Sequence, residues 1–394
     1  MSFPLARLGD RSLFPSLESR AYLAHAAVSP PSRLVIAEVT RCLQAYQRRG
    51  LHAAIDELGH KGEVRARAAT LLGCAPAQVA FVQSTSAGVT AIARSIRFRP
   101  RQRVVVFDGE FPANVTPWRL VADELLLDLV TLPLTPFLRS NAEGLALLRS
   151  ELERGVRLVA VSAVQFQTGL RMPLGALSKL CHAYGAELFV DAIQGLGVVP
   201  IDVLESGVDY LAAGGHKFLM GLEGAGLLYI RDSALSELSL GLAGWTGHED
   251  AFAFLTEGPG QLRYDRPIVR SAKFVEQGAL SVVGIAALGA SLMTLLSLGI
   301  DTIFEHVTAY LDRLEPALVA LGCESVRAPD LARRSASLSV RLPAGKVLAD
   351  VSRKLLAQGV CASTPDGLLR FSPHFANSLD ELPYVIASAR AALS

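Results

Sequence analysis

Four polar residues that could bind a cofactor lie close together between residues 191 and 217. Asp191 ends a short apolar run, residues 188–190, and Gln194 follows shortly after it. A second apolar run, residues 208–213, closes on two glycines, and His216 and Lys217 come next. The carboxyl ends of neighbouring strands meet at one edge of an α/β sheet, where such sheets bind ligands. We therefore expect these four side chains to lie together at that edge.

A carboxylate and a lysine at the ends of neighbouring strands are typical of a pyridoxal 5′-phosphate (PLP) site. The amine of Lys217 would form a Schiff base with the aldehyde of PLP, provided that burial or nearby positive charge lowers its pKa. Asp191 would keep the pyridine nitrogen protonated, which makes the ring an electron sink for a substrate carbanion. Either residue alone would equally fit a strand cap or a solvated loop lysine. The spacing of the whole group favours a PLP enzyme.

This stretch resembles the class V aminotransferase family of fold-type I PLP enzymes, which includes cysteine desulfurases, selenocysteine lyases, kynureninase and isopenicillin N epimerase. The pairs Asp191-x-x-Gln194 and His216-Lys217 match its central motif, and the resemblance runs from about Tyr22 to the last helix. It implies that Asp191 pairs with the pyridine nitrogen and that Gln194 approaches the ring hydroxyl. By the same resemblance, His216 contacts the phosphate and Lys217 carries the cofactor.

The resemblance also implies an architecture. The fold class expected is α/β, with a large domain built on a mixed, mostly parallel seven-stranded sheet and a small C-terminal α+β domain. Residues 1–30 are expected to form an arm that contributes to the small domain, and residues 31–285 the large PLP-binding domain. Residues 286–394 are expected to form a helical linker and the small domain. A homodimer is expected too, because sites in this family are completed across subunits.

Two hydroxyl residues, Thr85 and Ser86, stand where a predicted strand, residues 78–83, gives way to a helix. Hydroxyls at a helix start are ordinary caps, but free N–H groups there also bind anions. The family places the PLP phosphate at this point, which implies that Thr85 and Ser86 are cofactor ligands.

Desulfurases carry a histidine in the loop after the next strand, whereas this chain has Phe111-Pro112, as in the kynureninase branch. Phe111 is therefore expected to stack on the PLP ring, the alternative being that it packs under the loop.

Three further residues are candidates for the substrate side. Arg370 lies in a segment similar to the family's Arg-x-Ser, which implies a two-pronged salt bridge to the substrate carboxylate; alternatively it faces solvent. His25 lies in a segment that lines the substrate side in the family, and a surface turn is the competing interpretation. Trp245 stands in a glycine-rich loop that resembles the kynureninase branch. It would either reach a substrate, even across a dimer interface, or only shape its loop.

Several positions depart from the family pattern. Gly214 and Ala279 stand where relatives carry hydroxyl residues that bind the phosphate. Ala163 lies close to the position of a family asparagine that contacts the cofactor hydroxyl, and Gln165 is a candidate replacement. These losses motivate a different hypothesis, a non-catalytic scaffold with the same fold. The presence of Asp191 and Lys217 together with His216 and Arg370 speaks against a scaffold, which would not need them.

The composition excludes some classes of protein. Of 394 residues, 51% are hydrophobic and 19% charged, which describes a well-buried globular enzyme. A formal net charge of +1 argues against electrostatic binding to nucleic acid or to anionic membranes. The five cysteines form no Cys-x-x-Cys pair, and the N-terminus lacks a signal pattern, so we expect a cytoplasmic protein with reduced thiols and no metal site. The uncharged segment 277–300 is interrupted by glycines and predicts a buried helix rather than a membrane span.

The sequence constrains the reaction less than the cofactor. Persulfide-forming desulfurases need a thiol on a mobile loop ahead of the arginine strand, and Cys361, the only cysteine nearby, lies closer to a predicted strand than to a loop tip. The leading hypothesis is thus a PLP-dependent lyase that breaks a bond at the β carbon of an α-amino acid, for instance a carbon–sulfur bond. An aminotransferase or an amino-acid epimerase is the close alternative, because Lys217 could move the required proton in either case. A persulfide-forming cysteine desulfurase is disfavoured.

Overall fold

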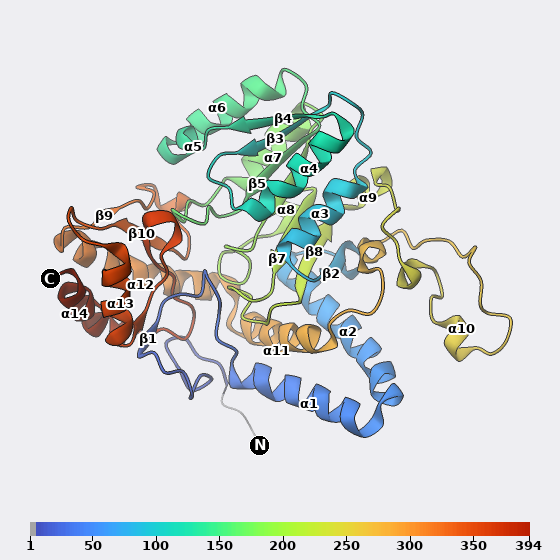
Figure 1. Cartoon of the computed structure of the whole chain (residues 1–394), viewed down its shortest axis with the longest axis horizontal. Helices are drawn as coiled ribbons and strands as arrows, with labels where there is room; N and C mark the ends of the chain where they lie inside the picture. The colour runs from blue at the N-terminus through green and yellow to red at the C-terminus, as the bar shows by residue number, and fades with distance from the viewer. Residues whose placement is uncertain (1–4) are drawn as a thin grey trace.

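A seven-stranded sheet forms the centre of the structure, a computed structural model in which residues 5–394 are described (Figure 1). The strand order is β2-β8-β7-β6-β5-β3-β4. β8 runs antiparallel to its neighbours β2 and β7, and the remaining pairs are parallel. The strands are β2 (Val79–Val82), β3 (Arg103–Phe107), β4 (Asp128–Leu132), β5 (Leu158–Ser162), β6 (Glu187–Asp191), β7 (Tyr210–Gly214) and β8 (Gly226–Ile230). The predicted fold class is confirmed.

Helices cover both faces of this sheet, so its central strands are apolar throughout rather than alternating. Successive residues point to opposite faces: Val105 and Val159 enter one buried cluster, with α2, α6, α7 and α11, while Val104 and Ala160 enter a second cluster, with α3 and α4. The helices that precede the C-terminal layer in the chain are α1 (Arg33–Arg49), α2 (Leu51–Leu72), α3 (Thr85–Ser95), α4 (Thr116–Leu125), α5 (Thr135–Arg139), α6 (Asn141–Leu152), α7 (Leu174–Ala183), α8 (Val203–Ser206), α9 (Asp232–Glu237), α10 (Ala253–Thr256) and α11 (Val282–Leu298).

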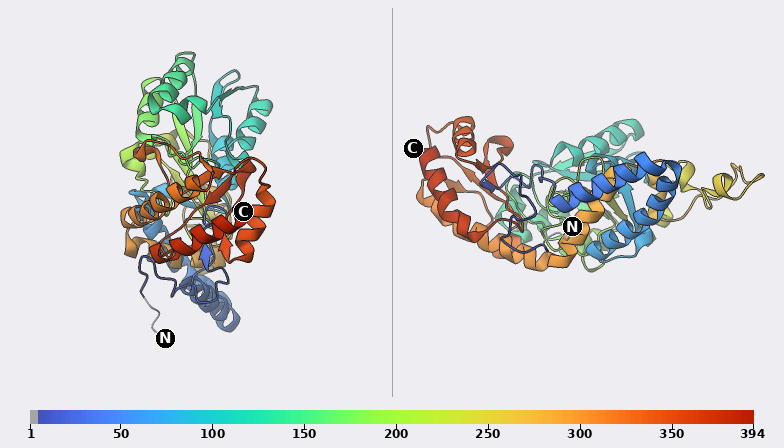
Figure 2. Two further views of the ribbon diagram at one scale, coloured as in Figure 1. Left: turned by 90° about the vertical axis from the view of Figure 1, so that its left-hand side faces the viewer. Right: turned by 90° about the horizontal axis from the view of Figure 1, so that it is seen from below.

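A smaller α+β layer forms the other end of the molecule (Figure 2). Its antiparallel sheet has the order β12-β10-β9, and α12 leads into it from α11. The N-terminal arm joins this layer, because β1 pairs in parallel with β11 and Ala24 forms a bridge with Ser372. The elements are β1 (Ala21–Tyr22), α12 (Ile300–Ala320), β9 (Glu324–Ser325), β10 (Leu338–Arg341), α13 (Leu348–Ala357), β11 (Val360–Cys361), β12 (Leu369–Phe371) and α14 (Leu382–Leu393).

The uncharged segment forms the buried helix α11, whose neighbours are α1 and α2. No individual helix within residues 5–394 is both long and apolar enough to span a membrane; α11 and α12 pass that test only as a pair bent by 78°. At the end of the molecule away from the small layer, the segment that carries α10 projects from the body (Figure 1). The run of residues 125–134 is divided between two elements, because α4 extends to Leu125 and β4 occupies only Asp128–Leu132.

Candidate active site

The predicted site lies at the carboxyl edge of the central sheet. Asp191 is the last residue of β6 and pairs in register with Ala212 of β7. β7 ends at Gly214, and the turn after it carries His216 and Lys217. Gly215 allows this turn, because a Cβ at that position would lie only 2.7 Å from the carbonyl oxygen of Ala225. The two strand ends therefore deliver the carboxylate and the amine to one place.

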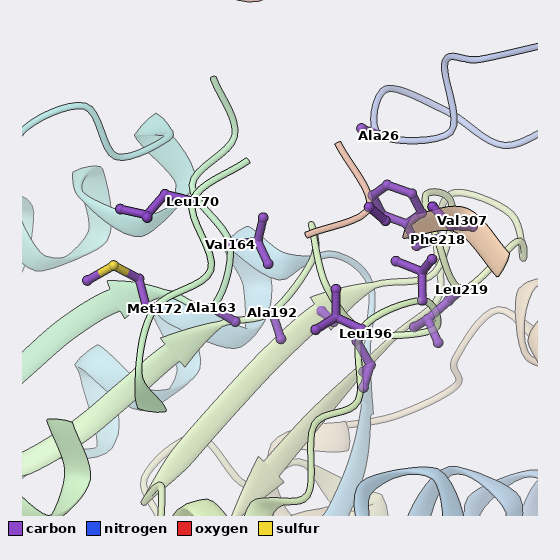
Figure 3. Close-up of a cluster of buried hydrophobic side chains, with 14 of the residues drawn as sticks. Ala26, Ala163, Val164, Leu170, Met172, Ala192, Leu196, Phe218, Leu219 and Val307 are labelled. Atoms are coloured by element: carbon purple, nitrogen blue, oxygen red, sulfur yellow. The ribbon is translucent and has the colours of Figure 1, made fainter. Parts of the chain in front are cut away.

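Asp191 is buried next to residues of an apolar cluster. Its side chain is 2% exposed, and the residue after it, Ala192, belongs to the same buried cluster as Phe218, the residue after Lys217 (Figure 3). Burial raises the pKa of Asp191 to about 6, although the N–H of Ile193 and the charge of Lys217 act to lower it. A carboxylate in such surroundings is stabilised by a cation placed against it. The protonated nitrogen of a pyridine ring would supply that cation.

Lys217 has the low basicity that a nucleophilic amine needs. Its pKa is lowered to about 8, mainly by burial; the charge of Asp191 acts to raise it, and the charge of Arg370 adds to the lowering. The ammonium nitrogen lies 5.5 Å from the centre of the Phe111 ring, and that ring is 44% exposed. The ring also contacts Phe166 edge-on, with 5.4 Å between the centroids. Lys217 thus has an acid, an aromatic ring and an arginine around it.

Arg370 is held in a fixed orientation on β12. Its Nε donates to the hydroxyl of Ser363 (3.0 Å) and its Nη1 to the carbonyl oxygen of Phe166 (2.6 Å). Burial lowers the pKa of Arg370 to about 10, which leaves the guanidinium charged at neutral pH. Within residues 5–394, its Nη2 makes no hydrogen bond. The outer edge of the Arg370 guanidinium is therefore available to a carboxylate, and its positive charge acts to lower the pKa of Lys217.

The predicted phosphate ligands surround the start of α3. Ser84, not Thr85 or Ser86, is the N-cap, and its hydroxyl accepts from the N–H of Ala87 (3.1 Å). The Thr85 hydroxyl is buried and accepts from the N–H of Gly214 (2.9 Å), so its own proton is free to be donated to an anion. Ser86 is exposed and lines a cavity of about 610 Å³ that Gly278 and Ala279 also line.

His216 is half-buried, and burial followed by the charge of Lys217 lowers its pKa, although Glu223 acts to raise it. The ring is therefore neutral at physiological pH, so it would meet an anion as a hydrogen-bond donor. Its carbonyl oxygen accepts from the N–H of Ser29 (2.8 Å), which ties the N-terminal arm to the lysine turn.

Gln194 provides a test of whether the residues fit PLP. Its amide nitrogen donates to the carbonyl oxygen of Ala26 (3.1 Å), while its Oε1 is buried and has no partner among the described residues. Buried polar atoms are rarely left unpaired, so this oxygen calls for a donor that the chain does not supply. The ring hydroxyl of PLP would supply it. Together with the uncompensated Asp191 and the weakly basic Lys217, this atom fits PLP.

Two of the predicted substrate residues lie apart from this group. His25 is fully buried; its Nδ1 lies 2.8 Å from the Ser29 hydroxyl, its ring contacts Tyr22 and His374 edge-on, and burial lowers its pKa well below the usual value. Trp245, 44% exposed, packs on Phe252 beside the projecting segment. Among residues 5–394, no hydrogen bond, ion pair or ring contact joins either of them to Lys217 or Arg370, and their roles on the substrate side stay predictions.

Sequence reasoning overlooked Glu110 and misassigned Gln165. The carboxylate of Glu110 accepts from the N–H of Ser162 (2.7 Å), from the Ser162 hydroxyl and from Asn114 (3.2 Å), which fixes the loop that carries Phe111. Burial raises the pKa of Glu110 to about 7, and the nearby Asp191 contributes to that rise.

Gln165 was a candidate for the missing cofactor contact, but all of its polar atoms are bonded within its own loop and to Gly109. That candidate role is wrong.

Comparison with known structures shows how widespread this architecture is. The cysteine desulfurase CsdA of Escherichia coli superposes with a TM-score of 0.82 at 23% identity, covering 97% of each chain. The cystine C–S lyase C-DES, in complex with its reaction product cysteine persulfide, gives a TM-score of 0.85 at 18% identity over 96% of this chain and 99% of that one. A C-DES variant with glycine covalently linked to its PLP cofactor gives 0.84 at 18%. At these identities the likeness establishes the fold.

Sequence comparison is more specific. A cysteine desulfurase of Klebsiella pneumoniae is 32% identical over 348 residues, which are 84% of this chain and 80% of that protein. An uncharacterised aminotransferase of Bacillus subtilis is 27% identical over 383 residues, 95% of both chains. The family model described as aminotransferase class-V matches residues 21–369, a span that includes Asp191, Gln194, His216 and Lys217. The chain therefore belongs to the class V aminotransferase family of PLP-dependent enzymes.

Proposed function

We propose that this protein is a PLP-dependent lyase that acts on an α-amino acid and breaks a bond at the β carbon, with a carbon–sulfur bond as the preferred target. The proposal rests on the arrangement of Lys217 between Asp191 and Arg370, combined with the lack of a cysteine in residues 362–368, the turn that leads to Arg370. The arrangement supports amino-acid chemistry on PLP. The missing thiol separates this chain from enzymes that store sulfur on a cysteine.

PLP, when bound, supplies an aldehyde for the substrate amine and a ring that withdraws electrons from the α carbon. Lys217 would hold the cofactor, and its amine could also remove the α proton of the substrate. Its pKa of about 8 suits a base working near neutral pH. Asp191 would place a negative charge against the ring nitrogen, and Arg370 would bind the substrate carboxylate and so orient the α hydrogen.

The segment ahead of Arg370 favours lyase chemistry over storage of sulfur on the enzyme. Residues 362–368 contain no cysteine. Cys361 lies in β11, where its carbonyl oxygen accepts from the N–H of Leu23 (2.8 Å), and burial raises the pKa of its thiol. A thiol with a raised pKa in a paired strand is a poor nucleophile. We infer that cleaved sulfur leaves with the product instead of being transferred to this cysteine.

L-Cystine is the first substrate to test. Loss of the α proton and cleavage of the Cβ–S bond, with the electron pair leaving on sulfur, followed by hydrolysis would give pyruvate, ammonia and cysteine persulfide from L-cystine and water. Holoenzyme incubated with L-cystine should release pyruvate and ammonia in equal amounts over many turnovers. Release of neither, while L-cysteine yields an enzyme-bound persulfide on Cys361, would refute the proposal in favour of a desulfurase.

An aminotransferase is the second candidate, because the relative in Bacillus subtilis that matches 95% of the chain is named as one. The same incubation distinguishes the two reactions. Transamination converts the bound cofactor stoichiometrically to its amine form, which is visible in its absorbance, and stops after one equivalent of keto acid unless an acceptor is added. Elimination leaves the aldehyde form in place and releases ammonia.

A further inference from the structure

Gln165 is the centre of a small hydrogen-bond network beside the site. Its Oε1 accepts from the N–H groups of Gln167 (2.9 Å) and Thr168 (2.7 Å) and from the Thr168 hydroxyl (3.0 Å). Its Nε2 donates to the carbonyl oxygen of Gly109 (2.7 Å) and to Oε1 of Gln167 (3.0 Å). The side chain is 3% exposed. Five hydrogen bonds on one buried amide saturate it, so it has no capacity left for a ligand.

One end of this network reaches the loop that carries Phe111. Gly109 adopts a φ of +72°, a conformation that favours glycine, and it presents its carbonyl oxygen to Gln165. The next residue, Glu110, is bonded to the end of β5, and Phe111 follows with its ring near the ammonium group of Lys217. The bond from Gln165 therefore fixes the point at which the chain turns toward Phe111.

The other end reaches Arg370. The residue after Gln165, Phe166, offers its carbonyl oxygen to Nη1 of Arg370 (2.6 Å). Gln167 donates from its side-chain amide to Asp366, in the turn that precedes β12. The carbonyl oxygen of Gln167 accepts from the Ser339 hydroxyl (2.5 Å), and Ser339 pairs with Arg370 between β10 and β12. The short segment that Gln165 folds is thus bonded to Arg370, to its strand partner and to its turn.

We propose that Gln165 is a positioning residue that couples the placement of the Phe111 loop to the placement of Arg370. A primary amide suits this role because it donates two hydrogens at one end while its oxygen accepts several at the other. A carboxylate would still accept from residues 167 and 168, but it would face the oxygen atoms of Gly109 and Gln167 with negative charge. The relevance of this coupling to catalysis rests on the proposed function. The coupling itself is a property of the fold.

The first test measures the coupling without any ligand. Hydrogen exchange is compared between the wild-type protein, Gln165→Glu and the uncharged Gln165→Met. The matched control is Gln78→Glu: Gln78 is also buried, at 6% exposed, but only accepts from the N–H of Ala75 (3.0 Å) away from this network. The expected change is a roughly tenfold faster exchange in both Gln165 variants, which corresponds to the loss of about one hydrogen bond. It should appear in the amides of residues 114–115, which report on the Phe111 loop, and in the amides of Ser363 and Arg370, which bond to each other. Changes confined to residues 163–169, or equal changes in the control, would overturn the proposal.

The second test measures the consequence for binding. Equilibrium dialysis should show PLP bound about tenfold more weakly by Gln165→Glu, and the KM for L-cystine should rise by a similar factor while kcat falls less. A purely local loss of stability would lower the fraction of active enzyme and leave KM unchanged, which would contradict the positioning role. If the wild-type protein does not turn over L-cystine, the proposed function fails, whereas the exchange comparison still decides whether Gln165 couples the two segments.

Discussion

Replacing Arg370 with glutamine tests the substrate side of the site most directly. The guanidinium carries the charge that a substrate carboxylate would meet, and it also donates to the carbonyl oxygen of Phe166, which lies far from it in the sequence. Glutamine is shorter and neutral, so it removes the charge and keeps at most one weak donor. Two separable effects follow: weaker binding of the carboxylate, and a carbonyl oxygen of Phe166 that is left without its donor.

The size of each effect follows from these contacts. A hydrogen bond to a charged group contributes roughly 1.5–3 kcal/mol, so losing the charged fork while keeping one neutral bond should raise KM about 100-fold. Leaving a buried carbonyl unpaired should lower the free energy of unfolding by about 1–3 kcal/mol. Because the charge of Arg370 lowers the pKa of Lys217, the variant should also raise that pKa above about 8.

Arg333 supplies a matched control. It is equally buried, and its guanidinium donates to the carbonyl oxygens of Phe137 and Arg139, so it too joins distant segments of the chain, but it lies outside the site. Arg333→Gln should lose stability in urea denaturation without a change in KM for L-cystine. The pKa of Lys217 can be followed in the cofactor-free protein through the pH dependence of its acylation rate, read by mass spectrometry.

A KM within a factor of three of the wild-type value, in a variant that is folded and binds PLP, would contradict the role of Arg370 in substrate binding. An equal rise of KM in Arg333→Gln would contradict it too, because the effect would then come from the lost contacts between distant segments alone. A fall in the pKa of Lys217 would contradict the electrostatic part only.

Three further predictions concern other parts of the structure. Lys217→Ala should abolish pyruvate release and leave no residue to which borohydride can fix PLP; fixation at another lysine would show that the site is misassigned. Burial lowers the pKa of His374 from 6.5 to about 4, so the folded protein keeps this ring neutral. Its contribution to the free energy of unfolding is fully present above pH 6.5, and about 3 kcal/mol is lost as the pH falls toward 4. His374→Gln should flatten the unfolding free energy in that pH range, and an unchanged slope would contradict this. Asp209 is buried, pairs with the partly exposed Arg231 and His182, and accepts from the buried N–H of Leu188 (2.7 Å), so Asp209→Ala should lower the free energy of unfolding in urea by roughly 1–3 kcal/mol, with PLP affinity unchanged.

The centre of the site could be predicted because the chain marks it locally. An apolar run that ends in Asp191, and another that ends in two glycines before Lys217, specify strand ends, and neighbouring strand ends meet at one edge of the sheet. The buried helix α11 was predictable for a similar reason, since its lack of charge and its glycines are local properties.

The surroundings of the site could not be predicted in the same way. Glu110 looks like a solvated loop acid until β5 brings Ser162, far along the chain, against it. Gln165 looks like a free amide until its loop closes on Gly109. β1 and β11 have two residues each, too few for any periodicity to show, yet their pairing decides that His25 is enclosed among aromatic rings. Such features depend on contacts between distant segments, which a single sequence does not display.

The N-terminal arm has a consequence for how the protein matures during synthesis. The N–H of Ala26 donates to the hydroxyl of Ser372 (3.0 Å), and the carbonyl oxygen of the same residue accepts from Gln194 (3.1 Å). Synthesis must have passed Ser372, and that residue must have left the ribosome, before that first bond can form. A nascent polypeptide that has already assembled the central sheet would still have its cofactor site open. Ribosome-stalled chains ending before Ser372 should therefore capture PLP poorly, and emergence of the segment around Ser372 would be the event that closes the site.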